Sequence, residues 1–173
     1  MTKFPIKPLP VLREPGTFEE VVGYDRIEAN YKEALKGPRK FKKEAVNYDL
    51  YRELNNVTLW RDLRKERYTP GNYYHTIITE PKRRALSIPG LRDKIVQLVV
   101  HEELQNIYRP VFAKRSFACQ YGKGPIRAAF NVQHDMRVSL YKWGEEATVI
   151  KLDVKKFFYS IARTILKQIL VKR

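Results

Sequence analysis

Apolar residues recur at helical spacing along most of the chain, and turn-forming residues separate the periodic stretches. A helix is expected to begin at residues 17–20, because Thr17 and Glu20 have the spacing of a capping box, in which each side chain caps the backbone of the other. Gly37-Pro38 stops the helical pattern that follows, and Pro110 stops a later one. The spacing predicts further helices over about 27–35, 44–64, 91–108, 125–141 and 157–170.

Two stretches rich in β-branched and aromatic residues predict a hairpin. Residues 74–79 form the first strand, residues 81–84 a tight basic turn, and residues 85–89 the returning strand. A third apolar stretch, residues 147–153, predicts a buried strand. Residues 1–16 contain four prolines and are expected to form an extended arm. This mixture of helices and strands predicts an α+β protein.

Positive charge is in large excess. The 173 residues include 34 Lys and Arg against 19 Asp and Glu, which gives a formal net charge of +15. The charge is spread along the chain rather than gathered on one amphipathic helix, so a nucleic acid fits better as the anionic partner than a membrane surface. Eleven Tyr and eight Phe lie among the basic residues, which suits stacking on unpaired bases. The alternative is a set of solvated charged faces around a Tyr-rich core.

Several classes of protein are excluded. The single cysteine, Cys119, rules out an internal disulfide framework and a thiolate metal cluster. No run approaches the roughly 18 consecutive apolar residues of a membrane span, and no secretory signal pattern follows Lys3. We therefore expect a soluble, cytoplasmic protein without a membrane partner.

Asp153 is the strongest candidate for chemistry. It would close an apolar strand just before a turn into Lys155-Lys156 and Phe157-Phe158. A carboxylate in that place is suited to Mg²⁺, which binds one or two carboxylates together with substrate phosphates. Two-metal phosphoryl transfer needs more than one such ligand. Taken alone, an Asp at the end of a strand is more commonly a turn or helix cap.

Four segments, in order along the chain, resemble motifs of the reverse transcriptases. Residues 150–161, Ile-Lys-Leu-Asp-Val-Lys-Lys-Phe-Phe-Tyr-Ser-Ile, are similar to the first palm motif of that family. Residues 80–89 resemble its fingers hairpin, residues 91–97 the helix start after the hairpin, and residues 116–124 the glycine-bearing motif that follows. The resemblance covers about residues 44–170.

Within this family, the Gly-Lys-Gly sequence at 122–124 and the Tyr-Thr-Pro-Gly sequence at 68–71 are most similar to bacterial enzymes of diversity-generating retroelements. Group II intron enzymes and abortive-infection polymerases are close alternatives. The resemblance implies reverse-transcriptase fingers, made of helices and a β-hairpin, followed by the first palm strand and its helix. The implied domains are an extended Pro-rich arm (1–16), an N-terminal helical segment (17–66), the fingers (67–146) and the start of a truncated palm (147–173).

The resemblance also implies roles around the palm motif. Asp153 would be the catalytic, metal-binding carboxylate, and the backbone carbonyl of Val154 would lie near a second Mg²⁺ ion. Phe158, five residues after Asp153, would be the steric gate whose ring excludes a ribose 2′-OH. The alternative for Phe158 is a core residue that opens a helix.

In the fingers, Lys82 and Arg84 match the cations that grip the triphosphate of the incoming nucleotide, and the alternative is a solvated hairpin tip. The resemblance implies that Arg92 and Lys123 contact the nucleic acid. An ion pair of Arg92 with Asp93 at the helix start is an equally good interpretation. For Lys123 the alternative is a plain flexible turn.

The chain also departs from a working enzyme. The other catalytic carboxylates of the family form an adjacent Asp pair in a later hairpin, and residues 154–173 contain no Asp or Glu. With one ligand of three, a two-metal site cannot assemble, so the chain is expected to be inactive alone.

The expected function is RNA-directed DNA synthesis by a parent protein that uses Mg²⁺, deoxynucleotides, an RNA template, a DNA or RNA primer and a small basic accessory protein. The alternatives are a non-catalytic RNA-binding module and a template-independent polymerase of a phage-defence system.

Overall fold

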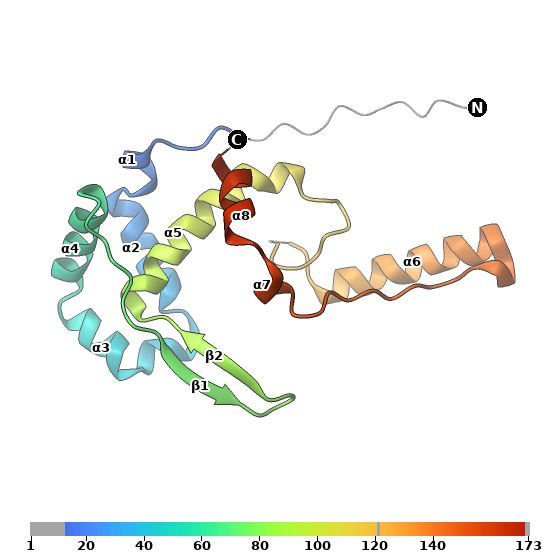
Figure 1. Cartoon of the computed structure of the whole chain (residues 1–173), viewed down its shortest axis with the longest axis horizontal. Coiled ribbons are helices and arrows are strands. Elements are labelled where there is room, and N and C mark those ends of the chain that lie inside the picture. Colours follow the sequence, from blue (N-terminus) through green and yellow to red (C-terminus); the bar gives the residue numbers. More distant parts are fainter. Residues whose placement is uncertain (1–12, 121, 172–173) are drawn as a thin grey trace. The chain divides into compact units, whose positions relative to one another are not determined.

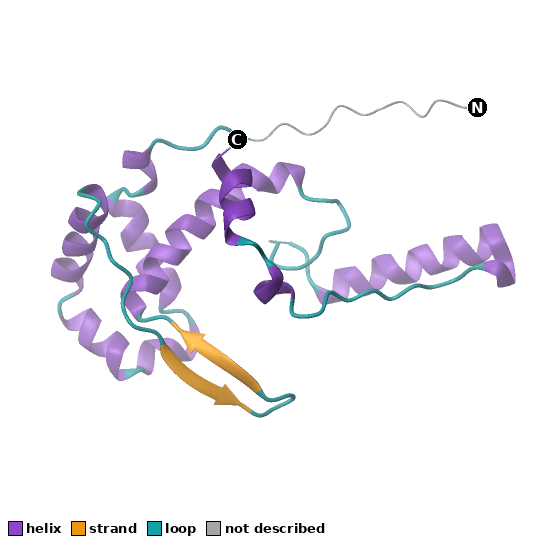
Figure 2. Cartoon of the chain, in the orientation of Figure 1, coloured by secondary structure: helices purple, strands orange, loops and turns teal. Residues whose placement is uncertain are grey.

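The computed structural model describes residues 13–120 and 122–171 of the chain. In that part the protein is mostly helical and contains an antiparallel β-hairpin, which confirms the expected α+β class (Figures 1 and 2). Most of the predicted arm, residues 1–12, lies outside the described residues, and residues 13–17 are not helical. Within the described ranges, no helix combines the length and the apolar character that crossing a membrane requires.

The chain divides into two compact units, the first ending at Ala113 and the second beginning at Lys114, a boundary that falls inside the range 67–146 expected for the fingers. In the first unit, α2 packs against both α4 and α5, and β1 pairs with β2 (Figure 1). The elements of this unit, with η marking 3-10 helices, are α1 (Phe18–Val21), α2 (Tyr24–Ala34), η1 (Gly37–Phe41), α3 (Lys43–Leu50), α4 (Arg52–Arg64), β1 (Tyr74–Ile78), β2 (Arg84–Ile88), α5 (Leu91–Tyr108) and η2 (Arg109–Val111).

The core of the first unit lies where α2, α4 and α5 meet. Ile27 of α2, Leu59 of α4 and Ile95 of α5 are fully buried. Apolar residues three and four positions apart give each helix one face to bury, and burial of that face holds the three helices together. Among the described residues, the buried cluster consists of Ile27, Tyr31, Ala34, Ala45, Leu59, Leu91 and Ile95.

Local signals in the sequence set several helix ends. The capping box at the start of α1 is confirmed, because the Thr17 hydroxyl accepts the N–H of Glu20 and the Glu20 carboxylate accepts the N–H of Thr17. The predicted bounds of α5 are confirmed as well. The first turn of α5 is capped from another helix, because the Glu44 carboxylate of α3 accepts the N–H of Leu91.

The helix predicted over 44–64 is two helices, α3 and α4, which separate at Tyr51. Tyr51 has a φ of −122°, which lies outside the helical range. The side chain of Asn55 donates to the carbonyl of Tyr48, and the hydroxyl of Tyr48 donates to Asn56. These polar contacts cross the break and stabilise it, and hydrophobic periodicity gives no sign of them.

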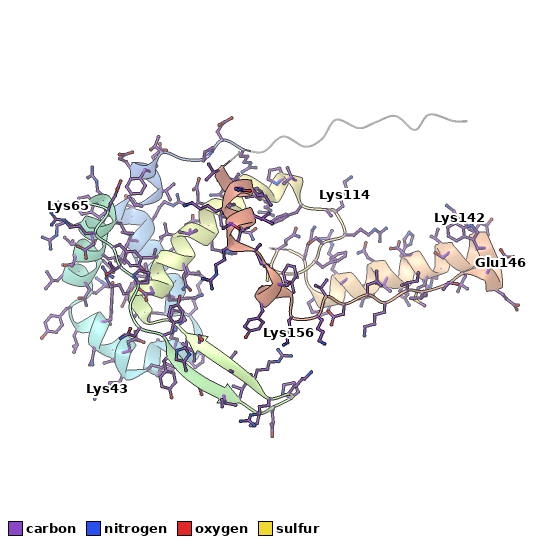
Figure 3. All side chains as sticks on the ribbon, viewed as in Figure 1. Lys43, Lys65, Lys114, Lys142, Glu146 and Lys156 are labelled. Carbon is purple, nitrogen blue, oxygen red and sulfur yellow. The ribbon has the colours of Figure 1, made fainter. Side chains whose placement is uncertain are left out.

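The second unit consists of α6 (Pro125–Trp143), the 3-10 helix η3 (Gly144–Glu146), α7 (Phe157–Ser160) and α8 (Arg163–Val171). Figure 3 shows its side chains, with Lys142 near the end of α6 and Lys156 just before α7. None of the described residues of this unit is buried, and large apolar side chains are exposed along it. The described part of the unit therefore has no hydrophobic core of its own.

The strand predicted over 147–153 is wrong. These residues form no strand and lie in an irregular segment, with Leu152 88% exposed and Val149 73% exposed. A strand is stable only when its backbone N–H and C=O groups pair with a neighbour, and the sheet of the described residues consists of β1 and β2. The apolar pattern of a buried strand is present here, but no strand among the described residues pairs with this segment.

The helix predicted over 157–170 is interrupted. The first piece, α7, ends at Ser160, whose hydroxyl donates to the carbonyl of Phe157 at 2.8 Å. Ile161 then takes an extended backbone conformation before α8 begins. Serine side chains compete in this way for the carbonyls that a continuing helix would use.

Glu103 of α5 ties the N-terminal end of the described chain to the helical body. Its carboxylate accepts the backbone N–H of Gly16 at 2.8 Å and the guanidinium of Arg26 at 2.9 Å. The hydrogen bond from Gly16 and the nearby Arg26 charge lower the pKa of Glu103, against the opposing effect of burial.

The lowered pKa gives the stability of the first unit a defined pH dependence. A carboxyl whose pKa is lower in the folded than in the unfolded chain stabilises the fold above its ordinary pKa of about 4.3, and this contribution is lost as the pH falls through the folded value. Glu103→Gln should therefore cost about 1–2 kcal/mol at pH 7 and flatten the loss of stability below pH ~4.3. Urea unfolding at several pH values measures this, with the more exposed Glu102→Gln as the control. Equal pH profiles for wild type and Glu103→Gln would contradict the prediction.

Candidate nucleotide and nucleic-acid interface

The predicted β-hairpin is confirmed, although its second strand begins at Arg84, which was expected in the turn, and ends at Ile88. Strand β1 is rich in β-branched and aromatic residues, which favour an extended backbone. The antiparallel register pairs Tyr74 with Ile88 and Ile78 with Arg84, so that residues 79–83 make the turn. Figure 2 shows the two strands in orange, joined at the turn.

Lys82, Arg83 and Arg84 gather at the tip of this hairpin, and all three are exposed. Lys82 and Arg83 lie in the turn, whereas Arg84 is the first residue of β2. Within the described residues, no hydrogen bond or ion pair engages these three side chains. Three cations without an internal partner can bind an anionic group, for which Arg offers a bidentate fork and Lys a point charge. The contact of Lys82 and Arg84 with a triphosphate stays a prediction.

Arg92, a predicted contact to nucleic acid, is engaged inside the first unit. Its guanidinium donates to the Asp62 carboxylate at 2.9 Å and to the carbonyl of Thr69 at 3.3 Å. It also lies 4.9 Å from the centre of the Tyr68 ring. The side chain remains 36% exposed, so one side of it can still meet a ligand. Its contact with nucleic acid stays a prediction.

The alternative ion pair of Arg92 with Asp93 is wrong. Asp93 is buried, at 4% exposed, and accepts the hydroxyl of Tyr68 at 2.7 Å instead. Burial, and then the hydrogen bond to Asp93, raise the pKa of Tyr68 to about 12, so Tyr68 keeps its proton at physiological pH and stays a donor. The two neighbouring residues of the helix start therefore have separate partners.

Lys123 closes the glycine-bearing loop that precedes α6. Its ammonium donates to the carbonyl of Ser116 at 2.9 Å and to that of Lys114 at 3.1 Å. Gly122 has a φ of +72°, which only glycine adopts readily, and its carbonyl accepts Arg127 at 3.0 Å. These contacts hold the described residues on the two sides of position 121 to one another. The predicted contact of Lys123 with nucleic acid would compete with its two carbonyl partners.

The site residues predicted around the palm motif, Asp153, Val154 and Phe158, are all exposed. Val154 is 63% exposed, and Phe158 is 84% exposed in the short helix α7. The Phe158 ring meets the Phe157 ring edge to face, with 5.4 Å between their centres. The alternative that Phe158 is a core residue is therefore wrong for the described chain, and its role as a steric gate stays a prediction. Asp153 lies in the exposed segment before α7.

The donor set around Asp153 does not make a metal centre. Among residues 13–120 and 122–171, no group of three or more His, Cys, Asp and Glu side chains is placed to hold a metal ion. A two-metal site needs several carboxylates, and Asp153 alone does not supply them. The expected Mg²⁺ therefore does not fit the residues described.

The basic residues are unevenly distributed. Residues 14–33 carry six Asp and Glu against two Lys and Arg, whereas residues 36–43 carry five Lys and Arg and no acid. Residues 114–173 carry thirteen Lys and Arg against four Asp and Glu. Phe41 is 77% exposed, and the Lys40 ammonium lies 4.9 Å from its ring centre. A polyanion would therefore be attracted to η1, the hairpin tip and the second unit rather than to α1 and α2.

Sequence reasoning missed the residues that hold the hairpin in place. Asp62, Tyr68 and Gly71 contact the first turn of α5, although they lie more than twenty residues before it in the chain. Nothing in the spacing of these residues marks such contacts. The Tyr-Thr-Pro-Gly sequence at 68–71 predicted a turn, but not what the turn packs against.

Comparison with protein-family models and with curated proteins found no match to this chain.

Proposed function

We propose that this chain contributes the nucleotide-binding and RNA-binding part of an RNA-directed DNA polymerase, a reverse transcriptase. The observation that carries the proposal is the β-hairpin with Lys82, Arg83 and Arg84 exposed and unpaired at its tip, within the described residues. In the resemblance to that family, this hairpin corresponds to the fingers hairpin whose cations bind the triphosphate of the incoming nucleotide. The ordered motifs at 91–97, 116–124 and 150–161 support the same reading.

The proposed role of the hairpin is electrostatic. A nucleoside triphosphate carries several negative charges, and Lys82 and Arg84 bind its phosphates as a point charge and a bidentate fork. Held in this way, the nucleotide presents its α-phosphate to the 3′-hydroxyl of a primer, and the fixed geometry removes much of the entropic cost of the reaction. Nucleotidyl transfer needs a catalytic carboxylate, a role that we assign to Asp153 from the resemblance.

The proposed partner of the remaining basic surface is RNA. Tyr73, just before β1, and Tyr74, its first residue, are 42% and 69% exposed, and η1 adds the exposed ring of Phe41 beside Lys40. Aromatic rings next to cations suit unpaired bases, which stack on the rings while the cations meet phosphates. An accessory protein and the subfamily of the polymerase stay predictions from the resemblance.

A second function is favoured by one observation. Asp153 has no other acid beside it that would complete a metal centre within the described residues. A chain with this composition can bind RNA through its fingers surface without catalysing a reaction. This non-catalytic RNA-binding module would bind RNA as tightly as the polymerase and would have no preference for deoxynucleoside triphosphates.

Nucleotide binding at the hairpin tip tests the proposed function. The double variant Lys82→Ala/Arg84→Ala should bind fluorescently labelled dATP about 10- to 100-fold more weakly than the wild-type chain, because two charge-assisted contacts are lost. Fluorescence anisotropy measures the affinity. The matched control is Arg61→Ala/Lys65→Ala, which removes the same charge from α4 and the residue after it.

The control should retain affinity to within about threefold at physiological salt, because exposed charges farther than a Debye length from the ligand are screened. Equal losses in the two double variants would mean that only net charge matters, which contradicts a triphosphate grip. RNA binding without measurable dATP binding by the wild type would favour the non-catalytic module.

A further inference from the structure

The hairpin is held at its roots rather than along its length. No residue of β1 or β2 is buried, although Thr76 and Ile88 are partly covered. An isolated two-stranded hairpin is marginally stable in water. The order and the direction of this hairpin therefore depend on the contacts made where each strand joins the helical body.

The root of β1 is attached to α5 through Asp93. Its Oδ1 accepts the Tyr68 hydroxyl at 2.7 Å, and its Oδ2 accepts the backbone N–H of Gly71 at 2.8 Å. A Cβ at position 71 would lie 3.4 Å from the same Oδ2, an ordinary van der Waals distance, so this contact alone does not require glycine. Both carboxylate oxygens are used to hold the segment 68–71 that leads into β1.

Neighbouring side chains of α5 hold the same segment. Arg92 donates to the carbonyl of Thr69 and stacks on the ring of Tyr68, while Asp62 of α4 fixes its guanidinium. Gln97, one turn further along α5, donates to the hydroxyl of Tyr73 at 3.2 Å. The approach to β1 is therefore attached at several successive points to one rigid helix.

The root of β2 is attached to different elements. Arg39 of η1 donates to the carbonyl of Pro89 at 3.2 Å. Glu44 of α3 accepts the N–H of Leu91, two residues later. The two strands are thus fixed independently to the helical body, at the root of β1 through Asp93 and at the root of β2 through Arg39 and Glu44.

We propose that Asp93 is a positioning residue, which locks the root of the hairpin through Tyr68 and Gly71 and so orders the basic tip for phosphate binding. Asp93 itself contacts no ligand in this proposal. The locking of the hairpin stands on the contacts above, whereas its effect on phosphate binding rests on the proposed function. The two parts therefore need separate measurements.

Tyr68→Phe tests the lock with the smallest possible change. It removes the hydroxyl that Asp93 accepts and keeps the ring, its packing against the core and its stacking with Arg92. Hydrogen–deuterium exchange followed by mass spectrometry should show about fivefold to tenfold faster exchange in peptides covering 71–90, because the lost hydrogen bond holds the root closed. Exchange in α2 and in the second half of α5 should not change.

Tyr108→Phe is the matched control, since its hydroxyl has no hydrogen-bond partner among the described residues. It should leave exchange in the hairpin unchanged. Unaltered hairpin exchange in Tyr68→Phe, or an equal increase throughout the first unit, would overturn the lock. Asp93→Asn, which keeps the shape of the side chain but loses the charge, should accelerate hairpin exchange more than Tyr68→Phe does.

Binding of labelled dATP tests whether the contacts of Asp93 at the hairpin root affect phosphate binding at its tip. Tyr68→Phe should weaken dATP affinity about threefold to tenfold and leave the slope of affinity against salt concentration unchanged, because no cation is removed. Lys82→Ala/Arg84→Ala should reduce that slope. Faster hairpin exchange with unchanged dATP affinity would overturn the positioning role. If the wild type binds no dATP, the proposed function fails, while the exchange experiment still decides whether Asp93 locks the hairpin.

Discussion

Asp153→Ala should lower RNA-templated DNA synthesis roughly 100-fold or more in the protein translated from its complete reading frame, while RNA affinity stays within about twofold. Asp153 follows an apolar stretch that resembles the first palm motif, and the resemblance assigns catalysis to its carboxylate. Alanine removes that negative charge and leaves the exposed segment 148–156 otherwise intact. Because Asp153 is exposed, its loss should cost the fold little.

Primer extension on an RNA template measures the first effect, and anisotropy of labelled RNA the second. Glu146→Ala is the matched control, because Glu146 is an exposed acid of the same unit, in η3, and has no predicted role. Synthesis by the Asp153→Ala protein at the wild-type rate would remove Asp153 from catalysis. Equal losses of DNA synthesis in Asp153→Ala and Glu146→Ala would point to a general effect of charge on RNA binding.

Ile95→Ala should reduce the free energy of unfolding of the first unit by about 2–5 kcal/mol. Ile95 is fully buried where α5 meets α2 and α4, so alanine removes apolar contacts and leaves a cavity. A loss of this size is a large part of the roughly 5–15 kcal/mol that stabilises a typical domain, so the midpoint of unfolding should shift to clearly lower urea concentration. Urea denaturation followed by circular dichroism measures it.

Val100→Ala is the matched control on the same helix. Val100 is 50% exposed, so its substitution should cost less than about 1 kcal/mol. Similar losses from both substitutions would contradict the position of the core. A loss from Ile95→Ala without any change in the hydrogen exchange of α2 would contradict the contact between α2 and α5.

Signals within a few residues of each other predicted much of the first unit correctly. The capping box of Thr17 and Glu20, the bounds of α5 and the two strands of the hairpin are all confirmed. These features depend on backbone propensity and on neighbours within one or two turns. The sequence carries that information directly.

The wrong predictions concern elements whose secondary structure depends on contacts that the local hydrophobic pattern does not contain. Residues 147–153 have the composition of a buried strand, but a strand needs a partner, and the described residues offer none. The break at Tyr51 depends on polar contacts of Tyr48 with Asn55 and Asn56. A hydrophobic pattern indicates which residues are expected to be buried, but it does not indicate which residues they pack against.

Some residues of the candidate site could be identified from the sequence, whereas the contacts that position them could not. The exposed cations of the hairpin tip follow from a basic turn between two strands, so Lys82 and Arg84 could be named from the sequence. The contacts of Asp93 with Tyr68 and of Arg92 with Asp62 could not be named, because they join elements separated by more than twenty residues. The alternative of an Arg92–Asp93 pair failed for this reason.

Incorporation of a single deoxynucleotide opposite a defined RNA base tests the proposed polymerase most directly. The protein from the complete reading frame would be supplied with a primer on an RNA template and with one deoxynucleoside triphosphate at a time. The expected result is addition of the complementary nucleotide alone, abolished by Asp153→Ala. Addition regardless of the template base, or RNA binding without any addition, would contradict RNA-directed synthesis.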